Sequence, residues 1–306
     1  MYKLFIGSAF GLLLFNSTAM AACSVPYPTF ASGTTADASQ VNANFAALVS
    51  CANSNAALAG YLSGLQLSAA GSSSTFGIAT GVATDSTAAA SMSLVTAYNK
   101  TTSSWAVGSG VGSLDTGSIA NNTWYHVFLI ERTDTGVVDV LVSLSATTPT
   151  LPTSYTLSRR IGSMKTDGSA RWIAFSQFGD QFIWASNVAS VIDVNYNSTT
   201  TQSAQTLNVP TGVRVVARIR GFFQGPTSAQ TTLTLSSPSE VSLTTSNPSY
   251  PSTSYVDAGA NGTNQGFTAD VLTNTTAQVN VVANSSSGSN LVRMTAYGWY
   301  DARGKN

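Results

Sequence analysis

Few side chains in this 306-residue chain have the chemistry and spacing for acid–base or nucleophilic catalysis. Its single histidine, His126, lies in an apolar run, and no Ser or Asp stands at a recognisable spacing that would make it a catalytic base. We therefore interpret His126 as a buried, hydrogen-bonded side chain. Cleavage of a glycosidic bond needs two carboxylates that face that bond. The acids considered for this role are Glu131, Asp134, Asp139, Asp167, Asp180 and Asp193.

Most of these acids fall in predicted turns, where Asp is favoured because its carboxylate hydrogen-bonds the local backbone. Asp139 differs, since it alternates with Val138 and Val140 inside a predicted strand. A metal site needs several convergent donors, but the sequence has one His and no Cys-x-x-Cys motif. The sequence therefore predicts no catalytic residue, no metal ligand and no cofactor.

Aromatic side chains are the better candidates for binding, because exposed rings are a common platform for sugars and for surface recognition. The ligand-binding candidates are Trp105, Tyr125, Trp172 and Trp184. The competing interpretation assigns these rings to the core, and strands as apolar as these favour the core for most of them.

The first residues resemble a cleavable export signal. A short region with one charge precedes an apolar stretch, Leu4 to Phe15, that is too short to span a bilayer. Residues 19–21 form a small-x-small cleavage motif, so we expect cleavage between Ala21 and Ala22. This predicts export to the periplasm, the cell surface or the medium, with no membrane span in the mature chain. Lipidation of Cys23 ranks lower, because the usual Leu is missing before it.

The two cysteines, Cys23 and Cys51, lie near the start of the predicted mature chain. In an oxidising compartment an isolated pair most simply closes one disulfide. We therefore expect a Cys23–Cys51 bond that ties an extended amino-terminal arm to the helix that carries Cys51.

Charge is sparse, since charged residues are 8% of the chain and the formal net charge is zero. Affinity for nucleic acid requires clustered Lys and Arg. The local concentrations are Arg159-Arg160 and the alternating Arg214, Arg218 and Arg220, so we expect no nucleic-acid partner. Arg159 and Arg160 are interpreted as a solvated rim or an ion pair between subunits. Low net charge also gives little protection against self-association, which favours a chain that assembles or is exported promptly.

Residues 123–184 are the core of a predicted all-β domain. Trp124 to Ile130 is apolar on both alternating faces, which predicts a strand buried on each side. Residues 133–136 then form a turn that ends in Gly136. Further on, Gly179-Asp180 is a two-residue loop typical of a type II′ hairpin.

A helix is predicted after Thr34 and Asp37, which fit a capping box. This pattern leaves two interpretations open: a short coiled-coil stalk in which Asn55 sets the register, or an amphipathic helix packed on its own domain. The pattern is a set of residues at alternating spacings of four and three, which places them along one side of the helix as a seam. These residues are Val41, Phe45, Leu48, Ala52, Asn55, Ala59 and Leu62.

The predicted fold is mainly β, with a short N-terminal helix followed by two antiparallel β-sandwich or jelly-roll-like domains. In the last hundred residues, seven stretches read as strands of ordinary length, and DARGKN is expected to be a polar end. The predicted boundaries are 1–21 for the signal peptide, 22–65 for the arm and helix, 66–196 for the first sandwich and 203–306 for the second.

Three parts of the chain resemble structural proteins of tailed phages and prophages. TFASGTTADASQVNANFAALV resembles a leader found near the start of many fibre, spike and tail-associated proteins. WYHVFLIERTDTGVVDVLVS with YTLSRRIGSM, and VPTGVRVVARIRGFF with GWYDARG, resemble their β domains. The resemblance implies a homotrimeric virion or fibre component that contacts a host surface. Because phage fibres normally assemble in the cytoplasm, the export signal points to a differently assembled phage or to a bacterial surface protein with a prophage-type domain.

The sequence is best explained by an exported structural and adhesive protein that performs no catalysis. Its expected partners are further copies of itself, cell-surface glycans, and other virion or surface proteins. One alternative is a secreted carbohydrate-active enzyme, a polysaccharide hydrolase or lyase, which predicts two carboxylates in one cleft. Another is a monomeric carbohydrate-binding module, which predicts a groove of exposed Trp side chains.

Overall fold

The computed structural model describes most of the chain in two compact units, Met1–Ala56 and Ala57–Asn306. For residues 51–56, 189 and 254–258 it gives the course of the backbone alone. The described residues are 25–27, 33, 35, 37–56, 58–189, 191–225, 231–240, 254–258, 264–284 and 290–305.

Several features of the amino-terminal region lie outside the described residues. These include the expected cleavage site between Ala21 and Ala22. Cys23 and the side chain of Cys51 also lie outside them, so the Cys23–Cys51 disulfide stays a prediction. Thr34, the first residue of the predicted capping box, belongs to the same group.

The first unit contains helix α1, Ala38–Ala56. Its cap is Asp37, whose carboxylate accepts hydrogen bonds from the backbone N–H and the hydroxyl of Ser39, both at 2.8 Å. These bonds lower the pKa of Asp37. The arm is held to the helix by a two-way amide contact, in which Tyr27 N–H donates to Asn44 Oδ1 at 3.0 Å and Asn44 Nδ2 donates to Tyr27 O at 2.7 Å.

Helix α1 is shorter than the predicted seam. It ends at Ala56, before Ala59 and Leu62, which were assigned to the seam's last two positions. Gly60 has φ +73°, a left-handed conformation that does not continue a helix. Leu62 belongs instead to the first β-strand and is buried in the core of the second unit. The prediction that the helical seam extends to Ala59 and Leu62 was therefore wrong, because Leu62 is buried in the core of the second unit instead of lying on the helix.

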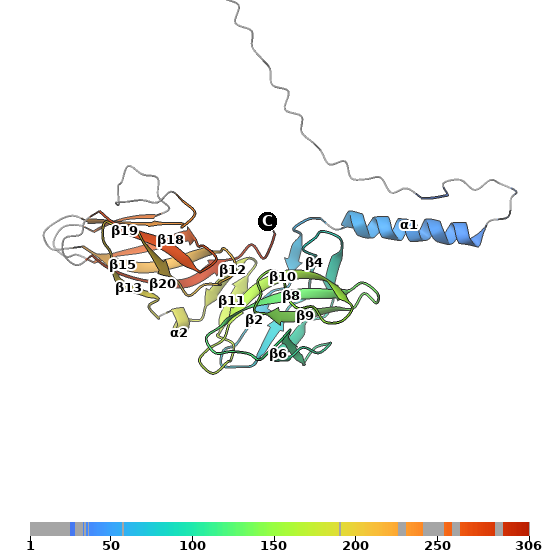
Figure 1. Ribbon diagram of the computed structural model, residues 1–306, viewed down its shortest axis with the longest axis horizontal. Helices are drawn as coiled ribbons and strands as arrows, with labels where there is room; N and C mark the ends of the chain where they lie inside the picture. The colour runs from blue at the N-terminus through green and yellow to red at the C-terminus, as the bar shows by residue number, and fades with distance from the viewer. Residues whose placement is uncertain are drawn as a thin grey trace, which may run out of the picture. The chain divides into compact units, whose positions relative to one another are not determined.

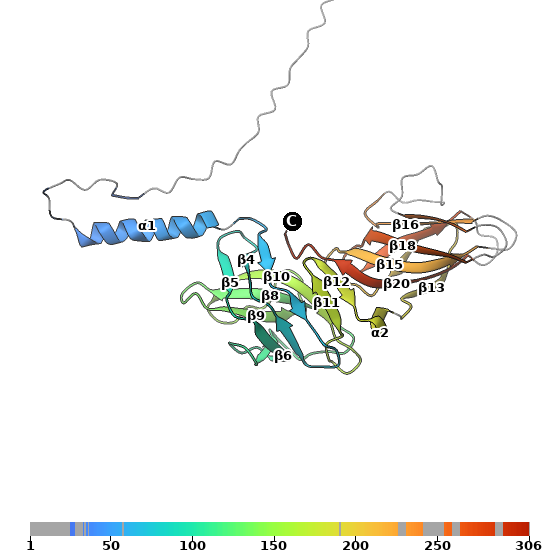
Figure 2. The same cartoon turned by 180° about the vertical axis from the view of Figure 1, so that it is seen from behind.

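The second unit is mainly β, in agreement with the predicted fold class. Most of its strands are labelled in Figures 1 and 2. The elements are β1 Leu62–Gly64, β2 Leu67–Ser68, β3 Thr75–Ile78, β4 Gly81–Thr84, β5 Ser91–Leu94, β6 Tyr98–Ser104, β7 Gly112–Leu114, β8 Trp124–Arg132, β9 Val138–Ser143, β10 Tyr155–Lys165, β11 Phe175–Phe178, β12 Gln181–Trp184, α2 Ser186–Ala189, β13 Val194–Asn197, β14 Ser203–Thr206, β15 Val216–Gln224, β16 Thr231–Ser236, β17 Ser254–Ala258, β18 Asn264–Leu272, β19 Gln278–Ala283 and β20 Leu291–Tyr300.

The largest sheet has the order β10-β8-β9-β7-β6-β3-β2. Every residue from Trp124 to Ile130 in β8 is buried, so the prediction of a strand covered on both faces is confirmed. The sheet is not purely antiparallel, because β7 runs parallel to both β6 and β9. A three-stranded sheet, β1-β4-β5, completes this half of the unit.

The remaining strands form a sandwich. Its first sheet has the order β11-β12-β20-β15-β18, with β13 also paired to β20, and its second has the order β14-β19-β16-β17. Strands β12 and β13 were assigned to the first predicted β domain and β20 to the second, yet they share this sheet. The strands on the two sides of the predicted boundary at 196–203 are therefore hydrogen-bonded to one another, and one hydrophobic core runs through both halves.

Aromatic side chains fill the region where the halves meet. The ring of Trp299 stacks on Phe182 at 5.0 Å, with Trp184 at 4.9 Å and Trp124 at 5.5 Å between centroids. Such ring pairs add stabilisation beyond the area that they bury. Because Trp299 comes from β20 and the other three come from β8 and β12, this cluster joins the end of the chain to its centre.

The carboxyl-terminal segment is also part of the fold rather than a simple polar end. Asp301 and Arg303 are 1% and 3% exposed. Asp301 forms two hydrogen bonds with Arg160, each of 2.6 Å, and Arg303 Nε donates to Asp180 at 2.9 Å. The expectations that DARGKN is a polar end and that Arg160 belongs to a solvated rim or a subunit contact were therefore wrong.

Candidate functional site

The histidine lies in the packed interior. His126 is 2% exposed, and its Nδ1 is 2.9 Å from Ser163 Oγ. The pairing of β8 with β10 brings together these two residues, which are 37 positions apart in the chain. Burial, assisted by the nearby Arg160 charge, lowers the pKa of His126 to about 4, so the ring is neutral at pH 7. Because Ser163 is fully buried, this pair faces other core atoms rather than a substrate.

Five of the six acids considered above have hydrogen-bonding partners within the fold. Glu131 is half-buried, and its pKa is raised by burial. Among the described residues, no carboxylate lines the groove between β2 and β11, the depression beside Arg220 and Arg293, or the hollow beside Val95 and Gly136. Within the described residues, no group of three or more His, Cys, Asp or Glu side chains converges. The partners are Arg132 for Asp134, Lys100 for Asp139, the amides of Ser169 and Arg171 for Asp167, Arg303 and Lys305 for Asp180, and the amides of Asn208 and Ala296 for Asp193.

Asp139, the acid that the sequence places inside a strand, forms a buried ion pair with Lys100. The two charged atoms are 2.8 Å apart and neither side chain is exposed. Lys100 Nζ also donates to the carbonyl of Ala106 at 2.8 Å, and Asp139 accepts from Gly108 N at 2.7 Å. The pair thus holds the loop between β6 and β7, which accounts for a mid-strand carboxylate without a catalytic role.

Three of the four aromatic binding candidates lie in the core. Tyr125, Trp172 and Trp184 are at most 3% exposed. Trp105 is half-buried and packs edge-on against Tyr155 with a centroid distance of 5.2 Å. None of the three core rings presents a face to solvent, so the predicted platform of exposed rings is wrong for them. The core interpretation is correct there: Tyr125 lies in β8, which is buried on both faces, Trp184 lies on the buried face of β12, and Trp172 packs edge-on against Phe76 and Tyr125.

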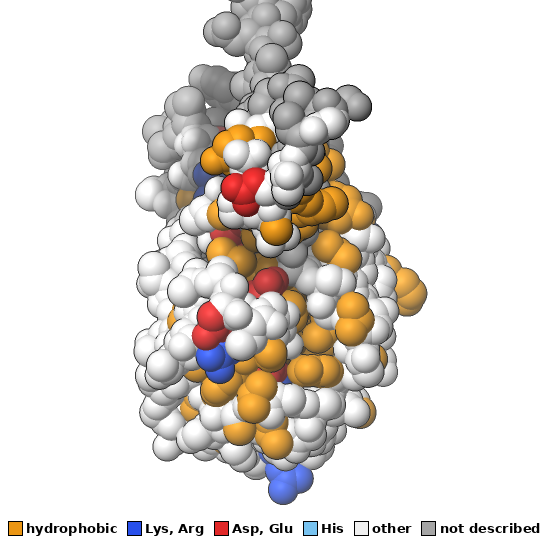
Figure 3. All heavy atoms as spheres, turned by 90° about the vertical axis from the view of Figure 1, so that its right-hand side faces the viewer, with side chains coloured by type: hydrophobic (Ala, Val, Ile, Leu, Met, Phe, Trp, Pro, Cys, Tyr) orange, Lys and Arg blue, Asp and Glu red, His pale blue; other side chains and the backbone are white. Residues whose placement is uncertain are grey.

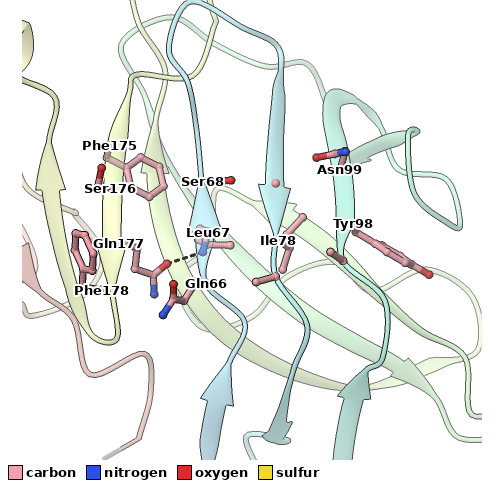
Figure 4. A pocket seen from close by; sticks show the side chains of 13 residues that line it. Gln66, Leu67, Ser68, Ile78, Tyr98, Asn99, Phe175, Ser176, Gln177 and Phe178 are labelled. Carbon is pink, nitrogen blue, oxygen red and sulfur yellow. Dashed lines mark hydrogen bonds between the residues drawn. The ribbon is translucent and has the colours of Figure 1, made fainter.

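A surface groove of about 510 Å³ lies where β2, β3 and β6 meet β11. Figure 4 shows the amides of Gln66 and Gln177 side by side, with Phe178 on one side of them and Tyr98 at the far side of the strands. The Phe178 side chain is 67% exposed, and Tyr98 is half-buried. The complete lining is Gln66, Leu67, Ser68, Gly77, Ile78, Ala79, Ala97, Tyr98, Asn99, Phe175, Ser176, Gln177 and Phe178.

The groove exists because two sheet edges meet there without pairing along their whole length. An isolated bridge joins Ala69 of one edge to Phe175 of the other. Next to this bridge, the Gln177 side chain takes the place of backbone pairing between the two edges. Its Oε1 accepts a hydrogen bond from Leu67 N at 2.6 Å, and its Nε2 donates one to Gly179 O at 2.7 Å. Because Gln177 is buried, its side chain forms the floor of the groove. The neighbouring exposed side chains remain available to a ligand.

The groove carries no charged side chain. Its lining combines amides, hydroxyls and the aromatic rings of Tyr98, Phe175 and Phe178. On the face of the molecule seen in Figure 3, charged side chains are scattered among hydrophobic and neutral ones. Sugars are recognised by hydrogen-bonding groups beside aromatic or apolar faces, so this composition suits a neutral glycan. It offers no acid, base or nucleophile for bond cleavage.

Sequence reasoning missed this groove, although one local signal points to it. In residues 175–178 the burial alternates, with Phe175 and Gln177 inside and Ser176 and Phe178 outside. Period-two alternation places Phe178 opposite the apolar face of its own strand. The partner positions in β2 and β6 are far away in sequence and carry no comparable signal.

Comparison with protein-family models, curated proteins and solved structures finds no match for this chain. The resemblance to tailed-phage structural proteins therefore stays a prediction, and the function is inferred from geometry. Among the described residues, no helix has the length and apolar character needed to cross a membrane.

Proposed function

We propose that this chain is an exported structural and adhesive protein that self-associates and contacts a cell surface through glycan binding. The observation that carries the proposal is the uncharged groove between β2 and β11, with Phe178 exposed beside the amides of Gln66 and Gln177. A neutral groove on a rigid β scaffold binds a polyhydroxylated ligand with little loss of conformational entropy.

The exposed apolar residues of α1 support self-association. Phe45, Leu48 and Val49 are 62%, 45% and 60% exposed, and Phe45 and Leu48 belong to the predicted seam. Apolar side chains at alternating spacings of four and three favour packing of one helix against copies of itself. We propose α1 as the contact between copies of the chain, with a homotrimer as the expected assembly.

The glycan part of the proposal is tested with the exported chain and a panel of immobilised neutral bacterial-surface oligosaccharides. We expect binding to at least one member of the panel and a loss of about tenfold or more in the Phe178→Ala variant. Val107→Ala is the matched control, because Val107 is 60% exposed on a loop outside the groove. Equal affinities of the two variants would contradict glycan binding at this groove.

The assembly part is tested by light scattering coupled to size exclusion. The native chain is expected to have the mass of three copies, and the Phe45→Ser/Leu48→Ser variant the mass of one, because the exposed apolar contact is removed. A monomeric native chain would contradict self-association and favour a monomeric carbohydrate-binding module instead.

A further inference from the structure

The outer face of the sheet formed by β20, β15 and β18 carries a pattern that the groove does not explain. Residues in β15 alternate, with Ala217 and Ile219 buried toward the core and Arg218 and Arg220 on the other side. The three strands run side by side in Figures 1 and 2. This alternation places guanidinium groups on the solvent side of the sheet.

Strand pairing brings a third arginine to the same face. Arg293 of β20 lies opposite Phe222 of β15, two positions beyond Arg220. Arg220 has Thr268 on one side and Thr295 on the other, so its cross-strand neighbours are hydroxyls. The face therefore gathers positive charge although the chain has a formal net charge of zero.

One acid partly offsets this charge. Asp270 of β18 lies opposite Arg218, with Oδ1 at 3.6 Å from Nε, and the Asp270 side chain is 52% exposed. An exposed pair at this distance is weak. Among the described residues, the pairing register puts Thr268 and Thr295 beside Arg220, and Phe222 and Asn195 beside Arg293.

Aromatic rings hold the arginines in place. The guanidinium carbon of Arg218 lies 4.9 Å from the Tyr297 centroid and 5.1 Å from that of Tyr300. Arg293 lies 5.5 Å from the Phe222 centroid, and its Nε donates to Asn195 Oδ1 at 3.1 Å. Stacking restricts the side chains and reduces the entropy lost when a ligand binds.

The face is also hollowed between two of the arginines. A depression of about 280 Å³ is lined by Arg220 and Arg293 together with Phe222 and Ile192, which is 50% exposed. The depression therefore combines two guanidinium groups with an apolar wall. A guanidinium binds a carboxylate through two parallel N–H···O bonds, and the ring and the aliphatic side chain suit the apolar face of a sugar.

We propose that this face is a second binding site, for an acidic polysaccharide whose carboxylates contact Arg220 and Arg293. It shares no lining residue with the neutral groove, so it does not depend on the groove's ligand. A carboxylate polymer fits better than a nucleic acid, because three arginines beside Asp270 make a small cationic site rather than the long basic track that a phosphate backbone requires.

The test uses the full exported chain and polygalacturonate, with methyl-esterified polygalacturonate as the uncharged match and single-stranded oligothymidylate as the nucleic-acid arm. The native chain is expected to bind polygalacturonate with an affinity that falls as salt rises, and to bind the ester at least about tenfold more weakly. Arg220→Gln/Arg293→Gln is expected to lose about tenfold or more in affinity for polygalacturonate.

The matched control is Arg132→Gln/Arg171→Gln, which removes the same charge from surface positions elsewhere and is expected to change affinity by less than about twofold. Thr268→Glu is an independent variant, since it places a carboxylate beside Arg220 at an exposed position and is expected to weaken binding. Phe178→Ala is expected to retain polygalacturonate binding, which separates this site from the groove.

Three outcomes overturn the proposal. The first is that the native chain does not bind polygalacturonate, and the second is that the control variant loses as much affinity as Arg220→Gln/Arg293→Gln. The third is tighter binding of oligothymidylate than of polygalacturonate, which would make the face a nucleic-acid site. Comparison of the unfolding midpoints of all variants identifies any loss that comes from misfolding rather than from the removed charge.

Discussion

Removal of the Asp301 carboxylate is expected to destabilise the β unit strongly. Asp301 is 1% exposed and Arg160 is 9% exposed, and two bonds of 2.6 Å join them. Asp301 Oδ1 also accepts from Arg303 N at 2.8 Å. In Asp301→Ala the Arg160 guanidinium stays buried, with the bond to Ser163 Oγ as its remaining described side-chain hydrogen bond.

Breaking a buried pair on one side costs about 3–5 kcal/mol, because the remaining charge keeps its desolvation penalty. For a unit of this size each kcal/mol corresponds to roughly 2–4 °C, so the melting temperature is expected to fall by about 6–20 °C. The assay is urea unfolding of the native and Asp301→Ala chains, followed by tryptophan fluorescence. Three of the five Trp side chains, Trp124, Trp184 and Trp299, lie at the junction and contribute to this signal.

Two further variants separate this explanation from a general surface effect. Asp134→Ala breaks the exposed pair with Arg132 and is expected to cost about 0–1 kcal/mol. Arg160→Met/Asp301→Asn removes both charges but keeps an acceptor for the buried backbone amide, so it is expected to recover at least half of the loss. A cost for Asp301→Ala within about 1 kcal/mol of that for Asp134→Ala would refute the buried-pair argument.

The other predictions concern acid stability and backbone packing. The folded pKa of His126 is about 4 against an ordinary value of 6.5, so below pH 6.5 the unfolded chain binds a proton that the folded chain excludes. Stability is therefore expected to fall by about 2 kcal/mol between pH 6.5 and 5, and less in His126→Gln; identical pH profiles in urea unfolding would contradict this. Gly298→Ala is expected to cost about 1–3 kcal/mol, because its Cβ would overlap a backbone carbonyl of β12. In the same assay Gly266→Ala, with open space around it, is expected to cost less than about 0.5 kcal/mol, and equal costs would refute the steric explanation.

Several local features were predictable from sequence because their causes lie within a few residues. The two-residue loop Gly179-Asp180 joins β11 to β12, and Gly179 has φ +59° as a type II′ turn requires. Gly136, with φ +68°, ends the turn between β8 and β9. The helix start was predicted less accurately, since the capping box put Thr34 at the cap and Asp37 inside the first turn, whereas α1 begins at Ala38 with Asp37 as its cap. These features depend on backbone preferences that neighbouring residues express directly.

The candidate sites were less predictable, because they depend on contacts between distant residues. Gln177 and Leu67 are 110 positions apart, yet their hydrogen bond forms the floor of the groove. Arg160 and Asp301 are 141 positions apart, and the sequence alone assigned them to a rim and to a polar end. For the aromatic binding candidates the sequence favoured the core for most rings, and Tyr125, Trp172 and Trp184 do lie there.

The sequence by itself determined a mainly β chain of low charge, with an N-terminal helix and turns at recognisable positions. Turn chemistry, a continuous apolar run such as that of β8 and a period-two pattern such as that of β15 are all local, and they suffice to predict these strands. Only the tertiary structure decided which strands share a sheet, and with them the neutral groove at Phe178 and the cationic face at Arg220 and Arg293. Sheet order depends on pairing between distant segments, such as β12 and β20, where the paired residues Gln181 and Tyr300 are 119 positions apart, and no short-range pattern encodes which edges will meet.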